Sequence, residues 1–184
     1  MGVYIPSTSY KLTPLNKLCL TLMVVALNVL ALYAGANFTW FILPAYLLTG
    51  AFGAILAYEK MLFHTFLALF LTTGISLLII STKTYILPYF ILLGIYPYIK
   101  QAVLRRLPDL FLRFFIKLLV CNLLAGGCYA ILLFIFKVNP LSALSDMPLY
   151  LIILILEAIF LLLDGITTLF TRVYDAFLRK ILFS

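Results

Sequence analysis

The sequence predicts an all-α, polytopic membrane helix bundle with six transmembrane helices and both termini in the cytoplasm. Three observations predict this fold. Hydrophobic residues make up 66% of the 184 residues and charged residues only 10%, whereas an ordinary soluble domain is about half apolar and about a quarter charged. The apolar stretches have lengths near the roughly 20 residues that a helix needs to cross a bilayer. No low-complexity segment or long linker divides the chain, so residues 1–184 are expected to form a single integral membrane domain.

Charged and turn residues divide the chain into six expected spans. Their approximate bounds are 15–34, 40–58, 61–81, 85–99, 110–136 and 148–171. The apolar run of the first span is followed by Ala34, Gly35 and Ala36, a stretch that resembles the cleavage site of a signal peptide. We expect an uncleaved helix instead, because the apolar run is long for a signal peptide.

The fourth span is the shortest and contains Pro88, Gly94 and Pro97. Proline removes a backbone donor, and the carbonyl groups that it leaves free need partners from neighbouring helices at membrane depth. This span is therefore expected to be kinked, tilted or partly re-entrant. Residues 100–117 follow it and are expected to form the main cytoplasmic connection.

The distribution of basic residues predicts the orientation. With the N-terminus inside, eleven of the thirteen Lys and Arg residues fall in cytoplasmic segments, and only Lys83 and Lys137 lie outside. Short cytoplasmic loops carry an excess of Lys and Arg, and these residues are attracted to the anionic inner leaflet. This topology explains the net charge of +7 without a nucleic-acid partner. The expected location is the cell membrane.

The basic stretch after the fourth span is expected to begin with a short interfacial helix. Ile99, Val103 and Leu107 share one face of it, whereas the basic residues lie mostly away from that face; these are Lys100, Arg105 and Arg106. Two interpretations stay open, a loop that anchors the chain on lipid and a surface on which Arg105 and Arg106 dock a cytoplasmic partner. A second amphipathic segment, 172–184, is expected to lie on the same leaflet.

Small residues spaced four apart mark helix faces that pack closely in membranes. Two rows have this spacing, Ala31 and Gly35 in the first span, and Ala45, Thr49, Gly53 and Ala57 in the second. The rows fit packing within the bundle. They also fit a smooth face that docks another membrane subunit.

The last span carries two acidic residues, Glu157 and Asp164, which are seven residues apart and so look out from the same side of a helix. Ionisable residues at membrane depth are costly and indicate functional sites or ion pairs. Lys117 lies at a similar depth on the antiparallel fifth span, so a structural ion pair between Asp164 and Lys117 is expected. Glu157 has no basic partner at its depth. It is therefore a candidate for contact with a solute, and the alternative is a hydrogen-bonded structural acid.

The other polar residues and the cysteines are expected to pack the helices together rather than to form a catalytic or metal site. Asn28 and Asn122 are expected to form interhelical hydrogen bonds. Cys19, Cys121 and Cys128 lie inside apolar runs without CxxC or Cys/His spacing, so neither a disulfide nor a metal site is expected. The chain lacks HExxH, GxSxG and a phosphate-binding glycine loop. We therefore expect a protein that is not an enzyme and has no cofactor.

The stretch TYILPYFILLGIYPYIKQAVLRR, together with six short helices and a basic connection after the fourth, resembles the substrate-binding S components of energy-coupling factor transporters. In that family an Ala-xxx-Ala pattern in the first helix meets a transmembrane coupling subunit. Here Ala31 and Gly35 have this spacing, whereas Ala26 is followed four residues later by Leu30. The resemblance implies a bundle that binds a vitamin-like solute from outside. The solute then passes inward when two ATPases drive the coupling subunit.

The resemblance also implies a place for the solute, near the outer ends of helices four to six. The residues of this chain in that region are Trp40, Tyr85, Tyr89, Tyr129 and Glu157. The main alternative is a non-catalytic structural or assembly membrane protein, which binds a partner through the basic arm or the small-residue face. A stand-alone channel or carrier, with the two acids of the last span along its path, is a third option.

Overall fold

The computed structural model describes residues 13–107, 109–138 and 148–179, and every regular element in these ranges is helical. The α-helices are α1 (Pro14–Asn37), α2 (Ile42–Tyr58), α3 (Leu62–Ile79), α4 (Ile86–Pro88), α5 (Tyr96–Arg106), α6 (Leu110–Phe134) and α7 (Leu149–Val173). Shorter segments are the 3₁₀ turns η1 (Thr39–Phe41) and η2 (Lys83–Tyr85) and the π-helical turns η3 (Tyr89–Leu93) and η5 (Tyr174–Leu178). The all-α prediction is confirmed for the part of the chain that the structure describes.

Six helical segments are long and apolar enough to cross a membrane, as the sequence predicts. They are Pro14–Asn37, Thr39–Tyr58, Leu62–Ile79, Lys83–Arg106, Phe111–Phe134 and Tyr150–Phe177. Four of the expected spans differ from these bounds by at most three residues. The chain therefore has the build of a multi-pass membrane protein.

The fourth span is longer than expected, because it runs over Lys83–Arg106 rather than 85–99. It consists of η2, α4, η3 and α5, with a π-type hydrogen bond from Gly94 N to Tyr89 O of 2.8 Å. Pro97 does not end this span. It lies in the first turn of α5, where its missing N–H removes no helical hydrogen bond.

The segment 172–184 is expected to form an amphipathic tail on the membrane surface. Its described part, residues 172–179, does not form a separate surface segment. Instead, α7 continues directly into η5. The continuation is held inside the bundle by Tyr174, which is fully buried and packs against Tyr58 at the end of α2. The expectation for 180–184 lies outside the described residues.

Side-chain caps define the starts of α1 and α6. Thr13 Oγ1 accepts a hydrogen bond from Asn16 N at 3.3 Å, and Pro14 occupies the first turn of α1. Asp109 Oδ1 accepts a hydrogen bond from Phe111 N at 3.1 Å. Both caps satisfy a backbone donor that the first turn of a helix leaves unpaired.

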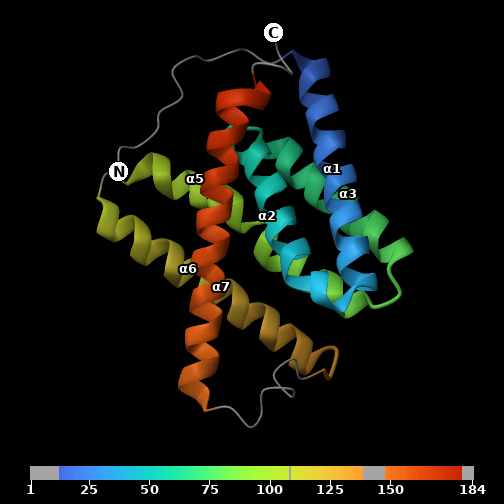
Figure 1. Ribbon diagram of the computed structural model, residues 1–184, viewed down its shortest axis with the longest axis vertical. Helices are drawn as coiled ribbons and strands as arrows, with labels where there is room; N and C mark the ends of the chain where they lie inside the picture. Colours follow the sequence, from blue (N-terminus) through green and yellow to red (C-terminus); the bar gives the residue numbers. More distant parts are fainter. Residues whose placement is uncertain (1–12, 108, 139–147, 180–184) are drawn as a thin grey trace.

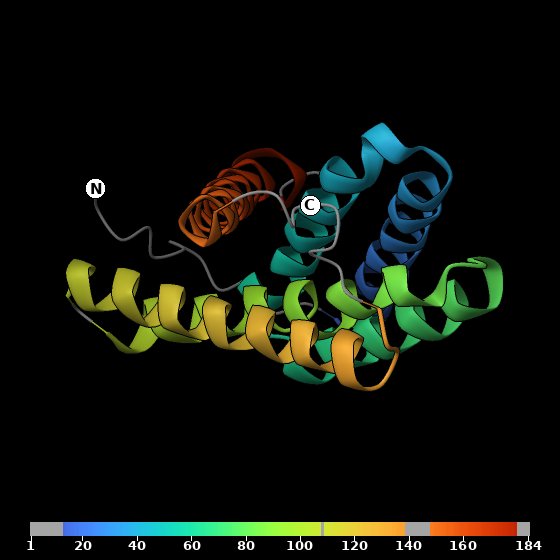
Figure 2. The same cartoon turned by 90° about the horizontal axis from the view of Figure 1, so that it is seen from below.

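Helix α2 lies between α1 and α7 in the bundle, and it also contacts α3 and α5 (Figure 1). Helix α6 is placed differently, because it lies in a separate layer and runs across α7 (Figure 2). One side of α6 is strongly exposed and apolar, with Phe111, Leu123 and Phe134 each at least 72% exposed. Such a surface fits contact with lipid.

The small-residue rows pack helices of this chain against one another. Ala45 and Thr49 are at most 1% exposed, and a Cβ atom on Gly35 would lie 2.6 Å from the Cβ of Ala45. A Cβ atom on Gly50 would lie 2.8 Å from Leu163 Cδ1 of α7. The interpretation as packing within the bundle therefore applies to both rows. The candidate docking residues among them do not form an open face; Ala31, Gly35, Ala45, Thr49 and Ala57 are buried and Gly53 is half-buried.

This packing predicts that Gly35→Ala destabilises the protein by about 1–3 kcal/mol, because the added methyl group overlaps Ala45 Cβ of α2 and the Tyr85 hydroxyl group. Gly74→Ala is the matched control. A Cβ atom at Gly74 has no neighbour within 4 Å, so this change is expected to stabilise α3 by about 0.5 kcal/mol. Unfolding of the two variants in mixed micelles measures both effects, and equal stability of the two variants would contradict the packing.

Candidate functional site

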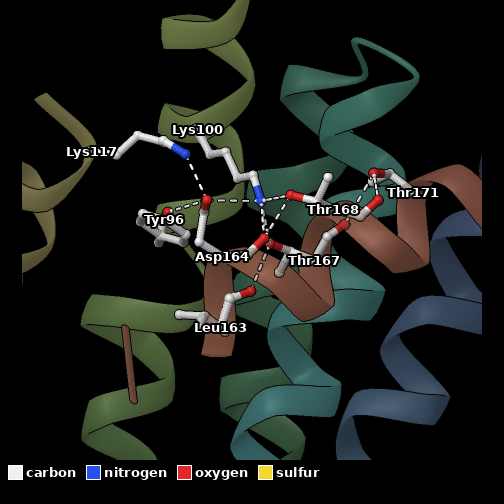
Figure 3. Close-up of polar contacts among 8 residues, drawn as sticks. All are labelled: Tyr96, Lys100, Lys117, Leu163, Asp164, Thr167, Thr168 and Thr171. Carbon is white, nitrogen blue, oxygen red and sulfur yellow. Dashed lines mark hydrogen bonds and ion pairs between the residues drawn. The ribbon is translucent and has the colours of Figure 1, made fainter. Parts of the chain in front are cut away.

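The most polar site of the described chain is centred on Asp164 of α7, where α5 and α6 meet that helix (Figure 3). Lys100 Nζ of α5 lies 2.9 Å from Asp164 Oδ1. Lys117 Nζ of α6 lies 2.6 Å from Asp164 Oδ2. Tyr96 Oη donates a hydrogen bond of 2.7 Å to Asp164 Oδ1. One carboxylate therefore joins three helices, and the expected pair of Asp164 and Lys117 lies together.

Two threonines on the next turn of α7 complete the site. Lys100 Nζ donates to Thr167 Oγ1 at 2.6 Å, to Thr168 Oγ1 at 2.7 Å and to the backbone oxygen of Asp164 at 2.6 Å. The threonine hydroxyls donate to helix carbonyl groups, Thr167 to Leu163 O and Thr168 to Asp164 O. Their lone pairs are therefore free to accept from the ammonium group.

We name this cluster the Asp164 junction. It comprises Tyr96, Lys100, Lys117, Asp164, Thr167 and Thr168. The spacing on α7 explains its assembly, since residues three and four apart lie on one side of a helix. Side-chain exposure is 4% for Lys100, 10% for Lys117 and 21% for Asp164. The junction is thus almost closed, with its remaining opening near the carboxylate.

The expectation for Lys100 was wrong. It does not lie away from the packed side of its helix but is 3% exposed inside the bundle. The buried side of α5 carries Tyr96, Pro97, Lys100 and Val103, so it shares Val103 with the expected apolar face but also includes this lysine. The sequence feature that indicates the buried position of Lys100 is its four-residue spacing from Tyr96, which places both residues on one side of the helix.

A second polar contact joins α6 and α7. Asn122 Nδ2 donates a hydrogen bond of 2.8 Å to Glu157 Oε1. Asn122 is exposed and Glu157 is half-buried. The partner of Glu157 is therefore a neutral amide, as in the interpretation of a hydrogen-bonded acid. We name two contacts the α6–α7 bridges: the ion pair of Lys117 with Asp164 and the hydrogen bond of Asn122 with Glu157.

The other candidate solute residues are spread over the bundle. Tyr85 stacks on Tyr46 at a ring-centroid distance of 4.8 Å, and Tyr46 Oη donates to Tyr85 O. Trp40 is 75% exposed, and its ring lies near Phe38 and Phe41. Tyr129 on α6 is half-buried. None of these residues lies against Glu157 in a common cavity of the described part.

Tyr89 belongs to a different polar region, in the interior between α1, α2 and α3. Its hydroxyl accepts a hydrogen bond of 3.4 Å from Asn28 Nδ2, the interhelical contact expected of Asn28. Both residues line a cavity together with Thr49 and Gly53, and it is about large enough for a single water molecule. Asn28 Oδ1 is buried without a hydrogen-bond partner, and it is the polar atom that such a water would satisfy.

A second cluster of charges ties the segment that follows α7 to the turn after α2. Arg179 Nε lies 3.0 Å from Glu59 Oε1, and Arg179 Nη1 lies 3.2 Å from Asp175 Oδ1. Tyr174 Oη also donates to Glu59 Oε1 at 3.0 Å. Burial opposes the charge of Arg179, but the two carboxylates outweigh it and raise the pKa of Arg179 above its ordinary value. Sequence reasoning missed this cluster, since no short-range spacing connects Glu59 with Arg179.

The two arginines proposed for partner docking have different surroundings. Arg105 Nη2 donates to Tyr58 O at 2.9 Å and to Ala57 O at 3.3 Å. It therefore satisfies carbonyl groups at the C-terminal end of α2, where a cation is also favoured by the helix dipole. Arg106 is exposed and makes no ion pair among the described residues.

Comparisons with other proteins do not extend this description. No known protein family, no curated protein and no solved structure matches the chain. The functional argument therefore rests on the polar side chains that the fold brings together and on the membrane character of the chain.

The geometry predicts that the two acids of α7 contribute differently to stability. Asp164→Asn leaves two buried ammonium groups without a carboxylate, so we expect a loss of about 3 kcal/mol or more. Glu157→Gln retains an acceptor for Asn122 and is expected to cost less than about 1 kcal/mol. Unfolding of both variants in the same micelles provides the measurement. A loss at Glu157 that equals the loss at Asp164 would contradict the description of the junction.

Proposed function

We propose that the chain is the membrane-embedded, substrate-binding subunit of a small-solute uptake transporter of the energy-coupling factor type. The observation that supports this function best is the polar side of α7, where Glu157, Asp164 and Thr168 face partners on α5 and α6 within an apolar bundle. Charged residues inside a membrane bundle are costly, and they occur mainly along substrate and ion pathways.

The contact between α6 and α7 is suited to exchange with a solute. The two helices lie in separate layers (Figure 2), and the α6–α7 bridges are made by polar side chains. Beside these bridges, a Cβ atom at Gly126, Gly127 or Gly165 would have no neighbour within 4 Å. A solute with hydrogen-bonding groups can replace the contact between Asn122 and Glu157 without breaking an apolar interface.

The proposed topology places both termini in the cytoplasm. The supporting observation is the sequence, in which only Lys83 and Lys137 of the thirteen basic residues lie in outer segments. In this orientation the exposed Arg106 faces the cytoplasm. The proposed partners are a transmembrane coupling subunit and cytoplasmic ATPases, and the proposed location is the cell membrane.

Labelling of single cysteines tests the topology. In a background with Cys19, Cys121 and Cys128 replaced by Ser, Lys83→Cys is expected to react with a membrane-impermeant maleimide in intact cells. Asp109→Cys is expected to react only after the cells are opened. The reverse pattern at these two positions would contradict the orientation.

Solute binding predicts a saturable rise in the melting temperature of the purified protein with one vitamin-like metabolite, because a ligand that binds only the folded state stabilises it. Glu157→Gln and Asn122→Ala are expected to raise the half-saturating concentration about tenfold or more. Asp109→Asn is the matched control, since Asn also caps a helix and this site is exposed on α6. An absence of any thermal response across a broad metabolite screen would remove the proposal.

A structural or assembly protein is the competing function. This function would use either the small-residue face or the basic arm to bind a partner. The small-residue face is weakened as a docking surface, because the row on α2 is buried against other helices of the chain. Its remaining support is the exposed Arg106. Loss of a co-purifying partner on Arg106→Gln, combined with no metabolite response, would favour this competing function.

A further inference from the structure

We propose that Lys117 binds an anionic group, a carboxylate or a phosphate, at the Asp164 junction. The first observation is the charge of the junction. The ammonium groups of Lys100 and Lys117 share the single carboxylate of Asp164. The junction thus carries one positive charge in excess, and an uncompensated charge at membrane depth is costly. A second negative group at this place removes that cost.

The described part of the chain does not supply this second negative group. Glu59 and Asp175 form ion pairs with Arg179, and Asp109 caps α6. Glu157 accepts from Asn122. Among the described residues, Asp164 is the one carboxylate that forms an ion pair with either lysine of the junction. Because no carboxylate of the described residues supplies the missing counter-charge, we infer that it comes from another molecule.

The two lysines differ in how completely their donors are used. Lys100 Nζ has four oxygen atoms within 2.9 Å, from Asp164, Thr167 and Thr168. Lys117 Nζ contacts only Asp164 Oδ2 among the described residues. An ammonium group carries three N–H donors, so Lys117 has two donors left for an external acceptor. The opening of the junction lies on the same side, because Asp164 and Lys117 are its more exposed charged side chains.

A third cation lies one turn away on α6. Arg113 precedes Lys117 by four residues and therefore shares its side of the helix. It is 7% exposed, and Nε, its one hydrogen-bonding donor in the described structure, contacts Leu107 O. Its terminal amino groups remain available. A guanidinium beside an ammonium group is suited to oxygen anions, which accept several charge-assisted hydrogen bonds.

Two sources of the anion share this chemistry. One is a carboxylate or phosphate of the transported solute, in which case the inference rests on the proposed function and narrows its substrate class. The other is the headgroup of an anionic lipid, which has access along the exposed apolar side of α6. In that case the inference holds without the proposed function.

The experiment measures the melting temperature of the purified full-length chain in phosphatidylcholine nanodiscs. Sodium phosphate and sodium acetate are titrated at constant ionic strength, with sodium chloride as the balancing salt. In a separate series, phosphatidylglycerol replaces increasing fractions of the phosphatidylcholine. We expect a saturable rise in melting temperature with phosphate or acetate if the site accepts a free anion, and with phosphatidylglycerol if it accepts a lipid headgroup.

Substitutions assign the response to the junction. Lys117→Met is expected to raise the half-saturating amount about tenfold or more, because a charge-assisted hydrogen bond is lost, whereas Lys117→Arg is expected to retain the response. Arg113→Gln leaves both ion pairs of Asp164 intact and is expected to weaken the response in the same direction. It also provides the test if Lys117→Met does not fold. The matched control is Lys83→Met, which removes an exposed lysine at the first residue of the fourth span, Lys83–Arg106.

Two results would overturn the inference. One is a wild-type protein whose melting temperature responds to none of the three probes. The other is an equal response in the wild type, Lys117→Met and Arg113→Gln. An anion response without any metabolite response would retain this inference and remove the proposed function, so the two can fail separately.

Discussion

A carboxylate buried among apolar helices needs partners, and the partners of Asp164 determine how α5, α6 and α7 meet. The acid alone would be strongly disfavoured at membrane depth, and so would Lys100 or Lys117. Together the carboxylate and the two ammonium groups form ion pairs. The hydroxyl groups on the next turn of α7 accept further hydrogen bonds from Lys100. The arrangement also ties α6 to α7, although the two helices lie in separate layers.

The bundle combines two kinds of helix contact with different physical properties. Around α2, small residues such as Ala45 and Gly50 allow close approach, so this part is held by many weak dispersion contacts. Between α6 and α7, polar pairs such as Asn122 with Glu157 bridge the layers. Polar pairs are directional and exchangeable, whereas close packing is not. A bundle with this division can keep its core fixed while the polar contacts between the layers exchange partners, as the proposed binding of a solute would require.

The membrane spans could be predicted from sequence because hydropathy and length act locally, whereas the partners of charged residues depend on how helices face one another. Depth alone was enough to pair Asp164 with Lys117, since antiparallel neighbours bring equal depths together. Lys100 is missed because the fourth span is expected to end at residue 99, whereas Pro97 begins a helix whose buried side includes that lysine. Arg179 and Glu59 were missed because their contact requires α7 to continue past its expected end.

In this structure Asp164 and Lys100 stabilise the protein through each other. A double-mutant cycle in nanodiscs or micelles tests it directly, with Lys100→Met, Asp164→Asn and the combined variant compared by free energy of unfolding. The account predicts a coupling energy of about 1 kcal/mol or more, with the combined variant more stable than the sum of the two losses implies. Losses that add to within about 0.5 kcal/mol would contradict the account, because independent residues behave in that way.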